Sequence, residues 1–403
     1  MTRLKFVAEV IAGQSPPSEV VSEFEHGLAF MQGNAEFGAL SPNPKWQVES
    51  PPKRAKEGDV LISVRAPVGA LNFADQAYGI GRGLAAIRAV NVNSGFLWWW
   101  LHTQIERLDA ESTGSTFRAI SSSNLENLDV PNLSRTEQHL IADFLDRETK
   151  RIDELLAEQR GLIETMRERR VELIAQGVTR GIDGGPLGTS PMPWIGVIPQ
   201  RWTSGRIKHL GEVTLGKMLQ PRGREGDIEA PYMRAANVQP DGVVADGEFK
   251  TMWFTPGELR SLDLQKGDVV VVEGGVGGYG RAAFLRESLV GWGFQNSINR
   301  IRPFGDGRFI AYYLQAVRAK GLMRAYSNIV SMPHLTAEKL KAMPVPIPPD
   351  VEQHRISEYL DDQTSRIDAL IAESEDLITL SLERRAALIT AAVTGQIDVR
   401  TAA

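Results

Sequence analysis

The residues most suggestive of chemistry are three glycines, Gly275, Gly277 and Gly280, which follow a run of four valines. Their spacing matches a dinucleotide-binding fingerprint, in which backbone amides at a helix N-terminus hold a pyrophosphate. A true fingerprint opens a helix and has an acidic residue about 20 positions on, whereas Asn299 and Arg300 stand at that distance here. We therefore interpret the glycines as a tight strand-turn-strand, and a nucleotide-dependent enzyme is only a third hypothesis.

Two histidines, His139 and His354, occupy matching positions in two similar stretches, which raises the question of a metal site. Their neighbours at helical spacing, Asp143 and Glu358, provide only a simple surface pair. No Ser/His/Asp set, pair of carboxylates, phosphate loop or adenine methyltransferase signature can be placed, and the absence of cysteine excludes thiolate sites. We expect this chain to have no catalytic site, metal or bound cofactor.

The stretches that hold these histidines belong to an internal duplication. A shift of 215 positions aligns residues 137–183 with 352–398, and 24 of these 47 positions are identical. Shorter matches continue upstream, such as Gly58-Asp59 against Gly267-Asp268. Solenoid repeats have periods of about 20–50 residues, so one large module occurs twice in this chain.

Each copy contains a long predicted helix with apolar residues at seven-residue intervals, which is typical of a coiled-coil seam. The predicted seam residues are Leu145, Ile152, Leu155, Leu162, Met166 and Leu173 in the first copy and Leu360, Ile367, Leu370, Leu377 and Leu388 in the second. Gln159 and Ser374 are polar at equivalent positions, and either fix the register or face a docked partner. The two stripes most simply pair with each other, although a partner's helices could compete.

The segments before these helices contain short β-branched runs separated by Gly, Pro, Asn and Asp, which predicts mostly strands. One helix is expected around Phe96 to Leu108 and another around Phe309 to Met323. The predicted fold class is α+β, with two mostly-β globules alternating with two long helices. The predicted domains are 1–130 (first globule), 131–180 (first long helix), 181–345 (linker and second globule) and 346–403 (second long helix and tail).

Charge and hydropathy limit the binding partners and the cellular location expected of the protein. The net charge is −5, but residues 181–345 hold 20 basic and 15 acidic side chains, against 11 and 14 in residues 1–130. The second globule could therefore face phosphate. The sequence opens without the apolar run of a signal peptide, and no stretch approaches 18 apolar residues. We expect a soluble cytoplasmic protein with no membrane contact.

The chain resembles the specificity subunit of type I restriction-modification systems. The resemblance covers nearly the whole chain and rests on PWIGVIPQRW at 193–202, GDVVVVEGGVGGYGR at 267–281, the closing AAVTGQIDV and, above all, the Glu-Gln helix entry followed by Thr-x-Arg-Ile-Asp in both copies. It implies that each globule is a target-recognition domain reading one half of a split DNA site. It also implies that the helices form an antiparallel coiled coil, which spaces the globules and docks two modification subunits.

The same resemblance implies a non-catalytic subunit that reads an asymmetric site in double-stranded DNA. Adenine-N6 methylation and ATP-driven cleavage would belong to the modification subunits and to restriction subunits attached through the complex. S-adenosylmethionine, ATP and Mg would then bind only to those partners. An alternative is a coiled-coil scaffold or decoy that does not read DNA, and the acidic first globule is its best support.

Base reading needs Arg, Lys, Asn or Gln on loops that enter a groove, with Arg favouring guanine and Asn or Gln favouring adenine. The candidates are Gln32, Asn34, Lys45, Arg65, Arg82 and Arg118 in the first globule and Gln220, Arg222, Arg224, Arg234, Asn237, Arg281 and Asn296 in the second. Each of them taken singly is more typical of an ordinary surface or turn residue. As a set they are candidates for reading bases, because the resemblance implies two DNA-facing surfaces.

Overall fold

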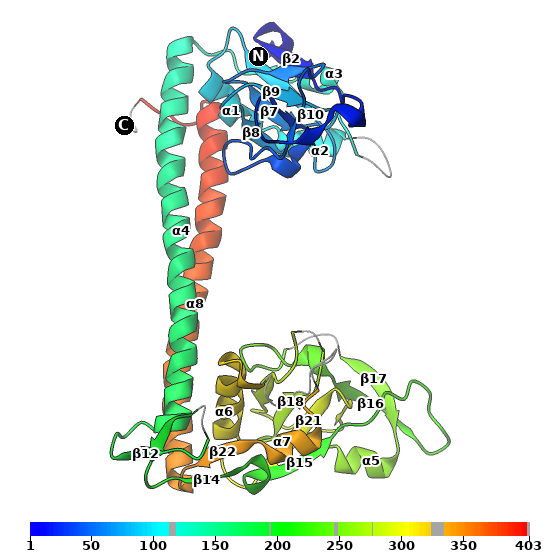
Figure 1. The fold of residues 1–403 in the computed structure, drawn as a ribbon, viewed down its shortest axis with the longest axis vertical. Helices are drawn as coiled ribbons and strands as arrows, with labels where there is room; N and C mark the ends of the chain where they lie inside the picture. Colours follow the sequence, from blue (N-terminus) through cyan, green and yellow to red (C-terminus); the bar gives the residue numbers. More distant parts are fainter. Residues whose placement is uncertain (113–117, 193–194, 246–248, 276, 324–333, 401–403) are drawn as a thin grey trace. The chain divides into compact units, whose positions relative to one another are not determined.

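The computed structural model describes residues 1–403 except 113–117, 193–194, 246–248, 276, 324–333 and 401–403. The chain divides into two compact units: Met1–Arg160 with Glu375–Ala403 form unit 1, and Gly161–Ser374 form unit 2. Each unit combines one globule with parts of both long helices (Figure 1). The predicted α+β fold class is confirmed. The two units divide the chain within the long helices, after Arg160 and after Ser374, and not at globule boundaries. The predicted domain boundaries after residues 130, 180 and 345 therefore remain a prediction.

Within the described residues, the globule of unit 1 contains three sheets and three short α-helices. Its strands are β1 (Thr2–Arg3), β2 (Ala8–Ala12), β3 (Ser22–Glu23), β4 (Ala29–Met31), β5 (Trp46–Gln47), β6 (Arg54–Ala55), β7 (Val60–Ser63), β8 (Leu71–Phe73), β9 (Tyr78–Ile80), β10 (Leu84–Ala89) and β11 (Asp129–Val130). Its helices are α1 (Ser94–His102), α2 (Ile105–Glu111) and α3 (Ser122–Glu126). The four-stranded sheet has the order β2-β10-β7-β8, the five-stranded sheet has the order β3-β5-β4-β9-β6, and β1 pairs with β11.

The globule of unit 2 repeats this plan. Its strands are β12 (Leu187–Thr189), β13 (Val197–Pro199), β14 (Thr203–Arg206), β15 (Gly211–Leu215), β16 (Ile228–Met233), β17 (Lys250–Phe254), β18 (Val269–Val272), β19 (Ala282–Phe284), β20 (Gly293–Phe294), β21 (Ile298–Pro303) and β22 (Pro344–Ile347). Its helices are α5 (Pro256–Ser261), α6 (Gly307–Ala319) and α7 (Ala337–Ala342). The sheet β15-β21-β18-β19 matches β2-β10-β7-β8, and β17-β16-β20 contains the counterpart of the parallel pair β4/β9.

One inner strand of each four-stranded sheet, β7 in unit 1 and β18 in unit 2, is buried on both faces, which explains its largely apolar sequence. Val269 and Val271 of β18 face the core that contains α6, whereas Val270 and Val272 face the core against the second sheet. In β7, Val60 and Ile62 face α1 and the long helices, and Leu61 faces the five-stranded sheet. Each globule is therefore layered, with its four-stranded sheet between two cores.

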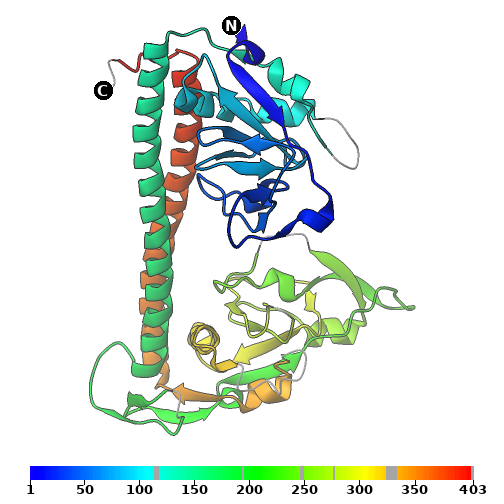
Figure 2. The ribbon, with the colours of Figure 1, turned by 45° about the horizontal axis from the view of Figure 1, so that its top comes forward.

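The two long helices are α4 (Arg135–Arg180) and α8 (Asp350–Val393), and they run antiparallel within each unit (Figures 1 and 2). In unit 1, Leu145 shares a core with Ile389, and Asp153 pairs with Arg385 at 3.1 Å. In unit 2, Arg170 pairs with Asp368 at 2.9 Å. The second ion pair repeats the first at a shift of 215, with the helices exchanged.

The buried stripe of these helices differs from the predicted seam at three positions. Leu145, Met166 and Leu360 are buried, and Ile152, Leu155, Leu173, Ile367 and Leu388 are partly buried. Leu162, Leu370 and Leu377 are instead 44%, 52% and 39% exposed, because Ile163, Ile371 and Ile378, one residue on, turn inward. Of the polar seam residues, Ser374 is buried and Gln159 half-buried.

Of the two shorter helices that the sequence predicted, the first differs from the structure. The helix expected around Phe96 to Leu108 is two helices, α1 and α2, because Thr103 ends α1 with its hydroxyl donating to the Trp100 carbonyl at 2.7 Å. Its counterpart in unit 2 is the single helix α6. In the part of the chain that the structure describes, no helix combines the length and apolar character needed to cross a membrane.

Candidate nucleic-acid interface

One end of the four-stranded sheet in unit 1 is held together by main-chain hydrogen bonds between its loops. The amide donors and carbonyl acceptors are Gly13 to Leu84 (2.9 Å), Gln14 to Ile80 (2.9 Å), Val64 to Gly83 (2.9 Å), Gly81 to Met31 (2.8 Å) and Ile120 to Val64 (3.0 Å). These bonds join the loop after β2, the end of β4 and the loop that follows it, the loop after β7, the turn between β9 and β10, and the segment before α3. Five segments that are distant in sequence thus form one surface.

The same end of the sheet in unit 2 repeats these bonds one for one. The pairs are Gly216 to Ile298 (3.1 Å), Lys217 to Phe294 (3.0 Å), Glu273 to Ser297 (2.9 Å), Gln295 to Met233 (2.9 Å) and Leu335 to Glu273 (2.7 Å). We call the two sets of loops the matched frames, defined by residues 13–15, 32–34, 64–66, 81–83 and 118–120 in unit 1 and 216–218, 234–237, 273–275, 295–297 and 334–335 in unit 2. The matched frames have the same pattern of main-chain hydrogen bonds and different side chains.

Five of the six predicted residues of unit 1 lie on its matched frame. Gln32, Arg65, Arg82 and Arg118 are exposed, and Asn34 is half-buried at the start of a 3-10 turn. The Gln32 side chain donates to Ser15 Oγ at 2.7 Å, and the same Oγ accepts from the Arg82 amide at 3.2 Å. Lys45 lies elsewhere, directly before strand β5, where its carbonyl accepts from the Phe24 amide.

Four of the seven predicted residues of unit 2, namely Arg234, Asn237, Arg281 and Asn296, lie on or beside its matched frame. Asn237 is only 4% exposed, and its side-chain oxygen accepts from the Arg234 amide at 3.0 Å. Asn237 is thus placed to fix the loop. Arg234 and Asn296 are half-buried, and Arg281 donates to the Val238 carbonyl at 3.4 Å.

The remaining three, Gln220, Arg222 and Arg224, lie on the loop between β15 and β16. Asp227 organises this loop, since its carboxylate accepts from the Gln220 side chain at 2.8 Å and from the Arg224 amide at 2.9 Å. Gln220 is half-buried and serves the loop, whereas Arg222 and Arg224 are exposed. This loop offers two cations to solvent.

The matched frames contain polar residues that were not predicted. Gln14 and Ser15 follow β2, and Glu273 and His334 meet where Gly274 and His334 form a β-bridge. Burial raises the pKa of Glu273, and the charge of His334 opposes that shift. Aligning the two copies through their strands, rather than through their helices alone, would have brought these residues to attention.

The glycine turn is the predicted strand-turn-strand. Strand β18 continues into β19, which pairs with it antiparallel, so no helix opens after the glycines. Gly275, Gly277 and Gly280 have φ of +105°, +77° and +70°, which favours glycine. Arg318 on α6 holds the turn by donating to the carbonyls of Tyr279 and Gly277, both at 3.1 Å. This geometry contradicts a dinucleotide fingerprint.

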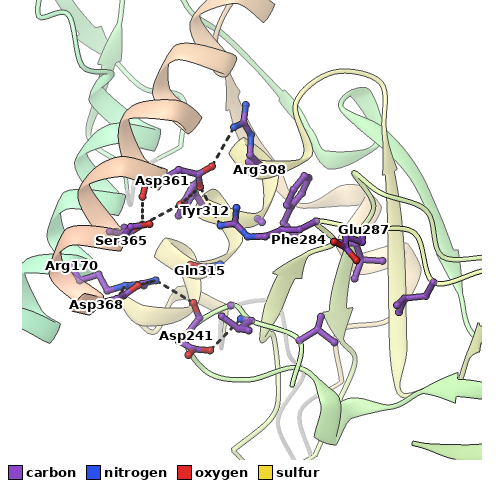
Figure 3. Close-up of a pocket in the computed structure, with 18 of the residues that line it drawn as sticks. Arg170, Asp241, Phe284, Glu287, Arg308, Tyr312, Gln315, Asp361, Ser365 and Asp368 are labelled. Carbon is purple, nitrogen blue, oxygen red and sulfur yellow. Dashed lines mark hydrogen bonds and ion pairs between the residues drawn. The ribbon is translucent and has the colours of Figure 1, made fainter. Parts of the chain in front are cut away.

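The globules contact the long helices through a repeated polar joint. In unit 1, the Trp99 indole of α1 donates to Asp146 of α4 at 2.8 Å. In unit 2, the Tyr312 hydroxyl of α6 donates to Asp361 of α8 at 2.6 Å, beside a pocket of about 370 Å³ (Figure 3). Arg308 also donates to Asp361, at 3.2 Å. The two aspartates are equivalent in the duplication.

The repeated Glu-Gln-His sequence near the start of each long helix also contacts the globule, close to the polar joint. His139 contacts Asn93, the N-cap residue of α1, at 3.1 Å, and His354 lies 4.0 Å from Asp306, the N-cap residue of α6. No cluster of three His, Asp or Glu residues suited to a metal ion occurs within the described ranges. These histidines are therefore placed to dock each globule on its helix.

Comparison with known proteins identifies the family. The model for the type I restriction modification DNA specificity domain matches residues 3–165 and 199–380. The chain belongs to this family, as the sequence motifs indicated.

Individual relatives agree with this assignment. Over 177 residues the chain is 36% identical to a putative type I restriction enzyme MjaX specificity subunit of Methanocaldococcus jannaschii, an alignment that covers 43% of this chain and 41% of that protein. The chain thus spans about two fifths of the length of this relative.

Two solved structures share the fold at 15% identity. One, described in work on complex assembly and conformational transition of the type I R-M system, has a TM-score of 0.75 and covers 97% of this chain and 96% of its own. The HsdS subunit from Thermoanaerobacter tengcongensis has a TM-score of 0.56 and covers 98% and 96%.

Proposed function

We propose that this protein is the DNA-recognition subunit of a type I restriction-modification complex, with one globule reading each half of a split, asymmetric site. The observation that carries the proposal is the pair of matched frames. Two surfaces with the same main-chain hydrogen bonds and different polar side chains suit two half-sites of different sequence. Base contacts supply the sequence information, whereas contacts to phosphate position the protein.

DNA binding also requires contacts to phosphate, and exposed cations at the matched frames are suited to make them. Arg65 and Arg118 lie beside each other, since the Ala66 amide donates to the Arg118 carbonyl at 3.1 Å. In unit 2, Arg222 and Arg224 project from the adjacent long loop. Each phosphate that such a cation neutralises releases condensed counterions and adds affinity without sequence preference.

The long helices would dock two adenine-N6 methyltransferase subunits and, through them, the restriction subunits. Leu162 and Leu370 in unit 2 support this, because they are large apolar residues left exposed on the outer faces of α4 and α8. The chain itself would be non-catalytic and cytoplasmic. S-adenosylmethionine, ATP and Mg would bind to the partners.

The test is a genome-wide map of N6-methyladenine in cells that express the neighbouring modification subunit, with and without this gene. We expect one split, asymmetric motif, with a methylated adenine in each half, that depends on the gene. If no motif appears although the chain still co-purifies with its partner, the scaffold or decoy alternative replaces this proposal.

A further inference from the structure

We infer that two pairs of residues at equivalent positions of the matched frames, Gln32 with Arg234 and Arg82 with Asn296, read bases at corresponding positions of the two half-sites. This inference rests on the proposed function. It assigns an adenine and a guanine contact to each half-site, in opposite order.

The equivalence of these positions follows from strand pairing. Met31 ends β4 and pairs in parallel with Ile80 of β9, whereas Met233 ends β16 and pairs in parallel with Phe294 of β20. The residues directly after the two methionines are Gln32 and Arg234. The main-chain bonds from Gly81 to Met31 and from Gln295 to Met233 then make the next residues, Arg82 and Asn296, equivalent as well.

In unit 1, direct packing holds the two side chains on adjacent loops. A Cβ added to Gly81 would lie 2.5 Å from Gln32 Oε1, and one added to Gly83 would lie 2.6 Å from the Gln32 carbonyl. Both glycines are therefore needed for the turn to reach Gln32. Arg82, between them, is exposed beside Gln32, and Ser15 Oγ bonds to both residues.

In unit 2, a hydrogen bond replaces this glycine contact. Ser297 Oγ accepts from the Ala235 amide at 3.2 Å, which ties the loop of Asn296 to the loop of Arg234. Arg234 Nε is buried and has no hydrogen-bond partner among the described residues, and the residue as a whole is half-buried. The frame thus holds one amide and one guanidinium side by side in each unit.

The chemistry of the four side chains sets the order of bases. Arg donates two hydrogen bonds to O6 and N7 of guanine, while Asn or Gln pairs with N6 and N7 of adenine. Gln32 can do so while bonded to Ser15, because its bond to Ser15 Oγ uses one of the two Nε2 hydrogens. Its Oε1, which accepts from Ser15 Oγ at 3.1 Å, has a second lone pair. At the first position unit 1 presents an amide and unit 2 a guanidinium, and at the second position the order is reversed.

The experiment measures methylation by the purified full chain with its modification subunit on a library of DNA duplexes randomised in both half-sites. Asn296→Arg should replace adenine by guanine at one position of one half-site, by roughly 5- to 150-fold. The other half-site should be unchanged. Arg82→Asn should make the opposite change in the other half-site. Arg286→Asn, at a residue 75% exposed in unit 2 and away from the frame, is the matched control.

The outcomes separate this inference from the proposed function. Absence of any motif with the wild-type protein would overturn both. A wild-type split motif that Asn296→Arg leaves intact, or that changes in both halves, would overturn the inference alone. If Asn296→Arg abolishes methylation, Asn296→Gln and Asn296→Ala decide, since only Gln can restore the adenine contact. Equal activity of these two variants would also overturn it.

Discussion

Tyr312 donates its hydroxyl hydrogen to Asp361 across 2.6 Å, and this bond joins the second globule to the helix α8. The first globule uses a different donor for the equivalent carboxylate, since the Trp99 indole donates to Asp146 at 2.8 Å. The helices therefore present the same acceptor twice, and each globule supplies its own donor. Replacing the surface of a globule while keeping this joint would preserve its attachment to the helices.

Tyr312→Phe should lower the free energy of unfolding by about 1 kcal/mol, because a buried hydrogen bond is lost while Asp361 keeps its bond from Arg308. Thermal unfolding of the full chain measures the effect. Tyr359→Phe is the matched control, because Tyr359 is a 39% exposed residue on α8. An equal loss of unfolding free energy in both variants would show that the hydrogen bond from Tyr312 to Asp361 adds no more stability than the hydroxyl of an exposed tyrosine.

A buried ion pair occurs at the same place in both units, between Asp59 and Arg88 at 2.8 Å and between Asp268 and Arg302 at 2.9 Å. Both carboxylates are 2% exposed, so Arg88→Met should leave the Asp59 charge buried with only its backbone bond from Lys56. We expect a loss of about 2 kcal/mol, discounted from the full burial penalty because Arg88 is 23% exposed.

Urea unfolding measures that loss. The control is Arg3→Met, which removes the exposed pair with Asp129 and should cost less than about 1 kcal/mol. A smaller effect at Arg88 than at Arg3 would contradict the account.

Stability should depend on pH through Glu273, because burial raises the pKa of its carboxyl. The folded state therefore holds this proton more tightly than the unfolded state. The resulting stabilisation is present below the unfolded pKa and is lost as pH rises through the folded pKa. Glu273→Gln should thus raise the melting temperature relative to wild type at pH 7 to 8, with the difference vanishing near pH 4. Glu287→Gln, an exposed residue of unit 2, should show no such dependence.

DNA binding should lose salt dependence when cations of the frame are removed. Arg65→Ala and Arg118→Ala should each weaken binding to all sequences and reduce the slope of log K against log salt by about 1. Fluorescence anisotropy with a duplex that contains the mapped motif measures this slope. Arg3→Ala is the control, because β1 lies at the β11 side of the globule and off the frame. An equal reduction of the slope for Arg3→Ala would indicate that the net charge of the globule attracts DNA, and not a binding surface at the matched frame.

The duplication allowed the long helices and the alternation of globule and helix to be predicted from the sequence. The inward face of the helices was harder, because adjacent apolar pairs such as Leu162-Ile163 and Leu370-Ile371 fit a seven-residue pattern in either register. Packing against the other helix decides between them, and that contact is not visible in a local pattern.

The candidate site was predicted in part for a related reason. Polar residues in Gly-rich turns were recognisable, and most of them do lie on the matched frames. Composition could not show that Asn237 serves as a buried cap of its own loop. It also could not show that the β-bridge between Gly274 and His334 brings Glu273 near His334, 61 positions away. Both facts depend on long-range main-chain pairing.

The core of unit 1 contains Ile389, Ala392, Val393 and Val399 together with residues of the first globule. During synthesis the first globule therefore lacks part of its core until the last turns of α8 have left the ribosome. At translation rates of roughly 5–20 residues per second, the interval between Leu145 and Ile389 is on the order of 10–50 s. Until then an apolar face of the first globule is uncovered, and transiently exposed apolar surface of this kind is prone to aggregation.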